Sequence, residues 1–84
     1  MRYTVICHPA AEEQLAAAFM AAADRPRVTA AARAIDEILR TAPVAFGESR
    51  DGELRVGFEP PLAVWYTVTD SDRTVVIVRF RLRT

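Results

Sequence analysis

The final third of this chain contains three segments in which apolar and polar residues alternate, and these segments constrain the fold most strongly. They span residues 53–59, 62–69 and 75–84, and the connections between them are Pro60-Pro61 and Asp70-Ser71-Asp72. A period of two is typical of strands with one buried face. Proline cannot lie inside a central strand, so Pro60-Pro61 fits a turn. Consecutive strands joined by short turns predict an antiparallel meander.

Two helices are expected between a short N-terminal strand and this meander. Residues 2–7 are rich in β-branched side chains and predict a strand. Residues 10–23 are rich in strong helix formers, and residues 27–41 carry an apolar stripe at helical spacing. The short break between them predicts a helical hairpin, and residues 42–52 predict a loop. The expected order is β-α-α-β-β-β, an α+β fold in which a helical hairpin packs on a twisted antiparallel sheet.

Length and charge limit what this chain can do. Its 84 residues suffice for a single small domain, residues 1–84. The formal net charge is zero, although all 11 basic residues are arginine. Bulk positive charge therefore cannot hold it to nucleic acid, and any anion-binding site must come from local clustering.

The remaining composition points to a reduced compartment and to no cofactor. One cysteine, Cys7, cannot form an internal disulfide, and Cys7 with His8 does not make a metal site. The sequence has no apolar run of 18 residues. We therefore expect a soluble, cytoplasmic protein with no metal, no cofactor and no membrane partner.

The last alternating segment carries a row of arginines. Arg79, Arg81 and Arg83 follow one another at every second position, so strict alternation places them on one strand face together with Ile77. The other face would then hold Val76, Val78, Phe80 and Leu82. Like charges in a row favour an anionic partner, because a face that only needed solubility would mix the signs.

Alternation in the other two segments extends this row into a surface. Arg55 and Trp65 are expected on the same uncovered face, and an exposed tryptophan there indicates a partner-binding surface. The candidate partner-binding residues are Arg55, Trp65, Ile77, Arg79, Arg81 and Arg83. Guanidinium groups bind carboxylates as well as phosphates, so internal pairing of Arg79 and Arg81 with Glu53 or Glu59 is an alternative.

The chain resembles the RelE/ParE superfamily of small bacterial toxins from type II toxin–antitoxin modules over nearly its whole length. The resemblance rests on residues 3–6, 9–15, 35–39, 43, 47–48, 52–56, 61–68 and 73–79. It implies a helical hairpin on a twisted antiparallel sheet and a cognate antitoxin whose extended or helical segment wraps the toxin. It also implies one of two activities: cleavage of mRNA on the ribosome in RelE-like members, or inhibition of DNA gyrase in ParE-like members.

Cleavage of RNA by its own 2′-OH requires a base, an acid and positive charge near the phosphorane. By the resemblance, Arg55 matches a basic residue of the first meander strand, and Arg81 or Arg83 matches an arginine near the end of the chain. Ala63 stands where RelE-like members commonly have an arginine, and the sequence ends at Thr84, where a histidine or tyrosine is expected. The usual nuclease site is therefore incomplete.

A degenerate nuclease site would be built on Arg55, Arg79 and Arg81, with Glu48 as an acid or base by position. His8 is expected at the surface or as a helix cap, and Tyr66 in the core by parity.

Three functions follow from these observations. The first is a toxin neutralised by a cognate antitoxin, with a ParE-like or undetermined target. The second is a RelE-like, ribosome-dependent mRNA endoribonuclease with a degenerate site. The third is a catalytically silent binding module of the same fold. The expected partners are an antitoxin, and either DNA gyrase or the ribosome with its mRNA; a homodimer or a toxin–antitoxin hetero-oligomer is the expected assembly.

Overall fold

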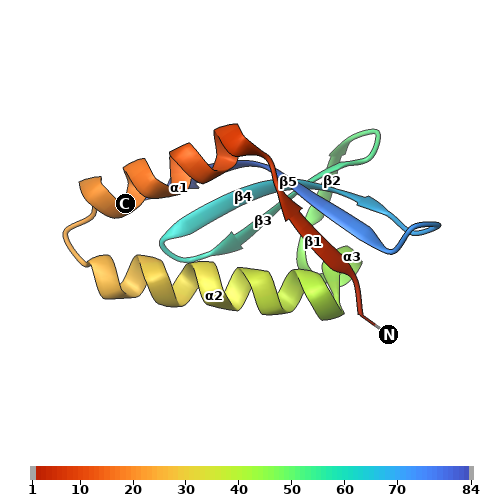
Figure 1. Ribbon diagram of the computed structural model, residues 1–84, viewed down its shortest axis with the longest axis horizontal. Coiled ribbons are helices and arrows are strands. Elements are labelled where there is room, and N and C mark those ends of the chain that lie inside the picture. The colour runs from red at the N-terminus through yellow and green to blue at the C-terminus, as the bar shows by residue number, and fades with distance from the viewer. Residues whose placement is uncertain (1, 84) are drawn as a thin grey trace.

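The computed structural model describes residues 2–83, which form an α+β fold (Figure 1). In chain order its elements are β1 (Thr4–Cys7), α1 (Pro9–Ala21), α2 (Arg25–Thr41), α3 (Pro43–Phe46), β2 (Glu48–Asp51), β3 (Leu54–Glu59), β4 (Leu62–Thr69) and β5 (Thr74–Leu82). The strands form one sheet in the order β1-β5-β4-β3-β2. β1 runs parallel to β5, and the other neighbouring strands are antiparallel.

The predicted α+β class, helical hairpin and antiparallel meander are confirmed. The segment 42–52 is not the predicted loop, because it contains the one-turn helix α3 and the edge strand β2. All four residues of β2 are exposed, so no burial pattern marks it in the sequence. Thr84, which alternation assigns to the last strand, lies outside the described residues.

Both long helices begin at side-chain caps. The His8 Nδ1 accepts a hydrogen bond from the Ala10 N–H at 3.1 Å, and the Asp24 Oδ1 accepts one from the Arg27 N–H at 3.1 Å. Such caps each stabilise a helix by about 1 kcal/mol because they satisfy donors that the first turn leaves free. The prediction that His8 has a surface or capping role is confirmed.

The helices α1 and α2 lie on one face of the sheet and enclose the core with it (Figure 1). The largest completely buried side chains come from both layers; they are Tyr66, Ile35, Leu39, Leu62, Val28, Val64, Val75 and Pro43. We call the sheet face on this side the inner face and the opposite one the outer face. Within residues 2–83, no helix has the length and apolar character needed to cross a membrane.

The turn at Pro60-Pro61 sets the register between β3 and β4. Glu59 pairs with Leu62, and it follows along the ladder that Arg55 pairs with Tyr66 and Val56 with Trp65. Directly opposed residues point to the same face of a sheet. Because Tyr66 is completely buried beneath the helices, Arg55 lies on the inner face and Val56 on the outer face.

The expectation that Arg55 lies on the uncovered face, which by alternation turned Leu54, Val56 and Phe58 toward the helices, is therefore wrong. That expectation assumed that the more hydrophobic side of residues 53–59 faces the helices, whereas the register places Arg55 and Gly57 on the inner face. Gly57 leaves room on that side for the Phe46 ring of α3, since a Cβ at position 57 would collide with it. The inner face of β3 is thus filled by a side chain from the segment predicted as a loop.

Candidate partner-binding face

A β-bulge in β5 decides which side chains reach the outer face. Trp65 of β4 pairs with Arg79, but the next residue, Tyr66, pairs with Ile77, so Val78 is an extra residue in β5. An extra residue reverses the alternation beyond it. Ile77 therefore points into the core, with 5% of its surface exposed, while Arg79 points outward.

The prediction that Ile77 shares a face with the arginines is wrong for this reason. Strict alternation also misplaces Val76, which pairs with Thr67 on the outer face, whereas Phe80 is buried as predicted. The bulge lets one strand supply apolar residues to the core along its length and still turn Arg79 and Arg81 outward.

Arginine and aromatic side chains stack on the outer face in two places. The Arg79 guanidinium carbon lies 4.8 Å from the centre of the Trp65 ring. Arg83 lies 5.3 Å from the ring centre of Phe58, a side chain with 49% of its surface exposed. Stacking of this kind stabilises an exposed pair by about 0.5–1 kcal/mol and fixes the direction of the guanidinium group.

Arg81 joins the two stacked pairs into one surface. Arg81 of β5 pairs with Ala63 of β4, and Ala63 pairs with Phe58 of β3. All three therefore lie in one row of the outer face. We call this surface the cationic–aromatic patch, and its members are Phe58, Trp65, Arg79, Arg81 and Arg83.

No acidic side chain forms an ion pair with this patch within the part of the chain that the structure describes. The ion pairs among residues 2–83 are Arg2–Glu37 and Arg40–Asp36, both far from it in sequence. The internal pairing of Arg79 and Arg81 with Glu53 or Glu59 that the sequence allowed does not form. Aromatic rings hold Arg79 and Arg83, and all three arginines keep their hydrogen-bond donors available for a carboxylate or phosphate partner.

Arg55 lies apart from the patch and has a structural role. Its guanidinium donates hydrogen bonds to the backbone carbonyls of Val44 at 2.7 Å and Gly47 at 2.6 Å. These carbonyls belong to α3 and its C-terminal end, where helices leave acceptors unpaired. The prediction that Arg55 extends the outer cationic surface is wrong, because the β3–β4 register turns it to the inner face.

Tyr66 stands beside Arg55 and is also structural. Its hydroxyl donates a hydrogen bond to the Pro43 carbonyl at 2.6 Å. Burial raises the pKa of the Tyr66 phenol, and the neighbouring Arg55 partly opposes that effect. The core position predicted for Tyr66 is confirmed.

The side chains that could act as an acid or a base are dispersed. His8 uses Nδ1 to cap α1, and Tyr66 is completely buried. Glu48 is exposed and pairs with Val56, which places it in the outer-face row that contains Trp65 and Arg79. Among residues 2–83, no group of three His, Cys, Asp or Glu side chains is arranged to hold a metal ion.

Two solved structures have the fold of this chain over its full length. One is a chain from the crystal structure of the toxin–antitoxin complex RelBE2 of Mycobacterium tuberculosis, with a TM-score of 0.76 and 24% identity, covering 99% of this chain and 100% of that one. The other is from the archaeal RelE–RelB complex of Pyrococcus horikoshii, with a TM-score of 0.70 and 20% identity, covering 99% and 97%. The fold that the resemblance implied is thereby confirmed. The chain matches no protein-family model and no curated protein.

Phe58 belongs to the patch but was not among the residues predicted for it. The signal was present in the turn, because pairing of the two residues that flank Pro60-Pro61 puts Phe58 opposite Ala63. The bulge at Val78 left no such signal, since every residue from Val75 to Val78 is apolar.

Proposed function

We propose that this chain is the toxin of a type II toxin–antitoxin module and is neutralised by a cognate antitoxin. The observation that carries the proposal is the full-length likeness to chains from two toxin–antitoxin complexes. The cationic–aromatic patch, whose arginines form no ion pair among residues 2–83, supports it, because such a surface on a protein of zero net charge suits a specific anionic partner.

For the target, we propose ParE-like action by binding, with the patch as the contact surface. Arg79 and Arg81 provide cationic donors, and Trp65 and Phe58 provide ring surface. Arg55 is engaged by two carbonyls on the other side of the sheet, which favours binding over a catalytic set made of Arg55, Arg79 and Arg81.

A second candidate is cleavage of mRNA at the ribosome. The stacked arginines and aromatics favour it, since bases stack on aromatic side chains while guanidinium groups hold phosphates. Glu48, on the same face, would be the acid or base. A silent binding module is the remaining alternative, and it predicts no growth phenotype.

Controlled expression tests the proposal. We expect induction of this chain to arrest growth and co-expression with the product of the adjoining reading frame to restore it. Two assays then distinguish the targets. Loss of supercoiling by purified gyrase indicates the ParE-like target, and cuts found by primer extension on translated mRNA indicate the RelE-like one. Growth that continues at a high soluble level of the chain would reject a toxin function.

A further inference from the structure

β5 is longer than the strand beside it at one edge of the sheet. β1 pairs with β5 only from Thr74 to Ile77, and the His8 N–H then donates a hydrogen bond to the Ile77 carbonyl at 2.9 Å. The chain leaves the sheet at this point and begins α1. Among residues 2–83, the stretch 78–82 of β5 therefore has β4 on one side and no strand on the other.

One side chain of α1 takes the place of the missing strand. In an antiparallel ladder, every second residue turns its N–H away from the partner strand. The Phe80 N–H does so, and it donates a hydrogen bond to the Gln14 Oε1 at 2.9 Å. In the described part of the chain, this is the one side-chain hydrogen bond between α1 and the sheet. Gln14 thereby satisfies a partly buried donor that would otherwise lack a partner.

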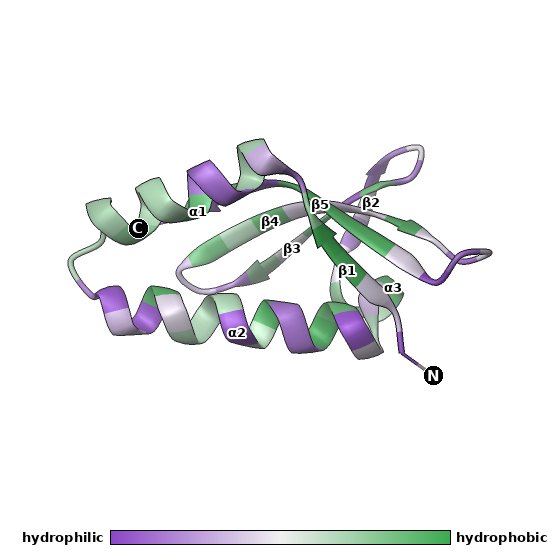
Figure 2. Cartoon of the chain, viewed as in Figure 1, coloured by the Kyte–Doolittle hydropathy of each residue, from purple (hydrophilic) through white to green (hydrophobic). Residues whose placement is uncertain are grey.

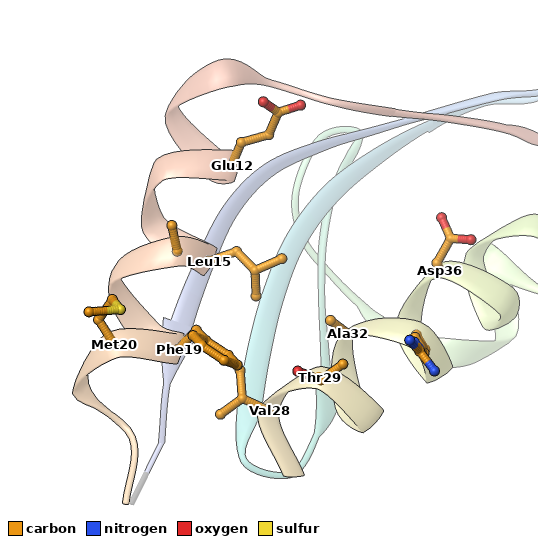
Figure 3. Close-up of a pocket in the computed structure, with 10 residues that line it drawn as sticks. Glu12, Leu15, Phe19, Met20, Val28, Thr29, Ala32 and Asp36 are labelled. Carbon is orange, nitrogen blue, oxygen red and sulfur yellow. The ribbon is translucent and has the colours of Figure 1, made fainter. Parts of the chain in front are cut away.

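Gln14 is the only polar side chain of α1 placed for this contact. The polar residues of α1 are confined to positions 12–14, and the rest of the helix is apolar (Figure 2). Glu12 lines the groove between α1 and α2, which Figure 3 shows in close-up, and Glu13 is exposed. Gln14 is half-buried. Its amide therefore serves β5 rather than the solubility of the helix.

The hydrogen bond fixes the part of β5 that sets the direction of Arg79. The Phe80 N–H belongs to the planar peptide unit that runs from the Arg79 Cα to the Phe80 Cα. This unit comes directly after the bulge at Val78, where the ladder is disrupted. If the extra residue lay one position later, Val78 would pair with Trp65 and Arg79 would lose its place opposite that ring. A fixed peptide unit at this point opposes such a shift.

We propose that Gln14 is a positioning residue for the cationic–aromatic patch. By binding the Phe80 N–H, it keeps the bulge at Val78 and directs Arg79 outward onto the Trp65 ring. Gln14 acts through the backbone of β5 and is not itself a member of the patch. Its effect on Arg79 stands on the geometry alone, whereas the consequence for partner binding rests on the proposed function.

Two substitutions at position 14 form a matched pair. Gln14→Met keeps the length and helix propensity of the side chain but removes the acceptor, whereas Gln14→Glu keeps an acceptor oxygen as well. The readout is the fluorescence emission of Trp65, the single tryptophan, in the isolated chain. Arg79→Ala gives the reference spectrum of a ring without its stacked cation. Tyr3→Phe controls for general loosening, because it removes a 2.8 Å hydrogen bond to Asp70 outside the patch.

We expect the emission of Gln14→Met to move toward that of Arg79→Ala. Gln14→Glu and Tyr3→Phe should keep the spectrum of the unmodified chain. An unchanged spectrum in folded Gln14→Met would overturn the proposal, and so would equal shifts in Gln14→Met and Tyr3→Phe. If Gln14→Met does not fold, Gln14→Asn replaces it with the same expectation, because its acceptor is one methylene shorter.

Growth after induction keeps this inference distinct from the proposed function. We expect Gln14→Met to lessen growth arrest at a soluble level matched to the unmodified chain, and Gln14→Glu to preserve the arrest. No arrest by the unmodified chain would reject the proposed function, while the fluorescence result would still decide the role of Gln14. Full arrest by Gln14→Met with a shifted spectrum would overturn the consequence for partner binding.

Discussion

Trp65 and Arg79 lie directly opposite each other on β4 and β5, with the guanidinium carbon 4.8 Å from the ring centre. Their pairing is the last before the β-bulge at Val78, so the outward direction of Arg79 depends on that extra residue. The cationic–aromatic patch is therefore a product of register as much as of composition.

The single tryptophan of the chain makes the patch observable. Trp65 lies within it, so we expect its fluorescence emission to change when a short single-stranded RNA or an acidic peptide binds. Arg79→Glu should weaken that binding by about tenfold or more, because it reverses a charge beside the reporter. Arg50→Glu is the matched control, since Arg50 is exposed on β2 outside the patch. Equal losses in the two variants would mean that the response reports overall charge only.

The bulge makes opposite predictions from strict alternation for two adjacent residues. Ile77 is buried in the core, so we expect Ile77→Ala to lower the free energy of unfolding by about 2–4 kcal/mol. Val76 pairs on the outer face, so Val76→Ala should cost less than about 1.5 kcal/mol. Denaturant unfolding of both variants measures this difference, and a reversed order would restore strict alternation.

Arg55 should matter for stability rather than for chemistry. Arg55→Lys keeps the charge, but both hydrogen bonds to the Val44 and Gly47 carbonyls come from the guanidinium Nη2, a position that the shorter lysine side chain does not reach. We expect it to lower the free energy of unfolding by about 1–3 kcal/mol. Its partner-binding affinity at a temperature where it is folded should stay unchanged. A loss of binding with full stability would place Arg55 in the functional surface after all.

The buried Tyr66 predicts a loss of stability in alkali. Burial raises its pKa in the folded chain above the value in the unfolded chain, so the folded state holds this proton more firmly. The free energy of unfolding should be constant with respect to this group below about pH 10 and should fall as the pH rises further. Tyr66→Phe should flatten the fall, measured by denaturant unfolding at several pH values. Part of the slope should persist, because the hydrogen bond to Asp70 raises the pKa of Tyr3 as well.

Much of the fold could be predicted because its signals are local. Pro60-Pro61 and the polar turn at residues 70–72 divide the meander, and the apolar stripe of α2 gives Ile35 and Leu39 to the core. The faces of β3 and β5 could not be predicted in the same way. They depend on how a turn and a bulge set pairing between strands. Hydrophobicity assigns Phe58 to the wrong side of the sheet, and strict alternation does the same for Ile77.

The candidate site was predicted in part for the same reason. Trp65, Arg79 and Arg81 share the outer face as expected, since Trp65 pairs with Arg79 and both arginines follow the bulge. Ile77 lies on the other side of it, and the carbonyls that bind Arg55 come from α3, an element too short to leave a periodic pattern. The hydrogen bond between α1 and β5 behind the patch requires the relative placement of a helix and a strand, which no local pattern contains.

The most direct test of the patch as the functional surface is growth after induction of the doubly substituted chain Arg79→Ala with Arg81→Ala, at a soluble level matched to the unmodified chain. Neither arginine contributes to the core or to an ion pair within residues 2–83, so the variant should fold normally. We expect the unmodified chain to arrest growth and the variant to leave growth unaffected. Full growth arrest by the folded variant would contradict the assignment of function to the cationic–aromatic patch.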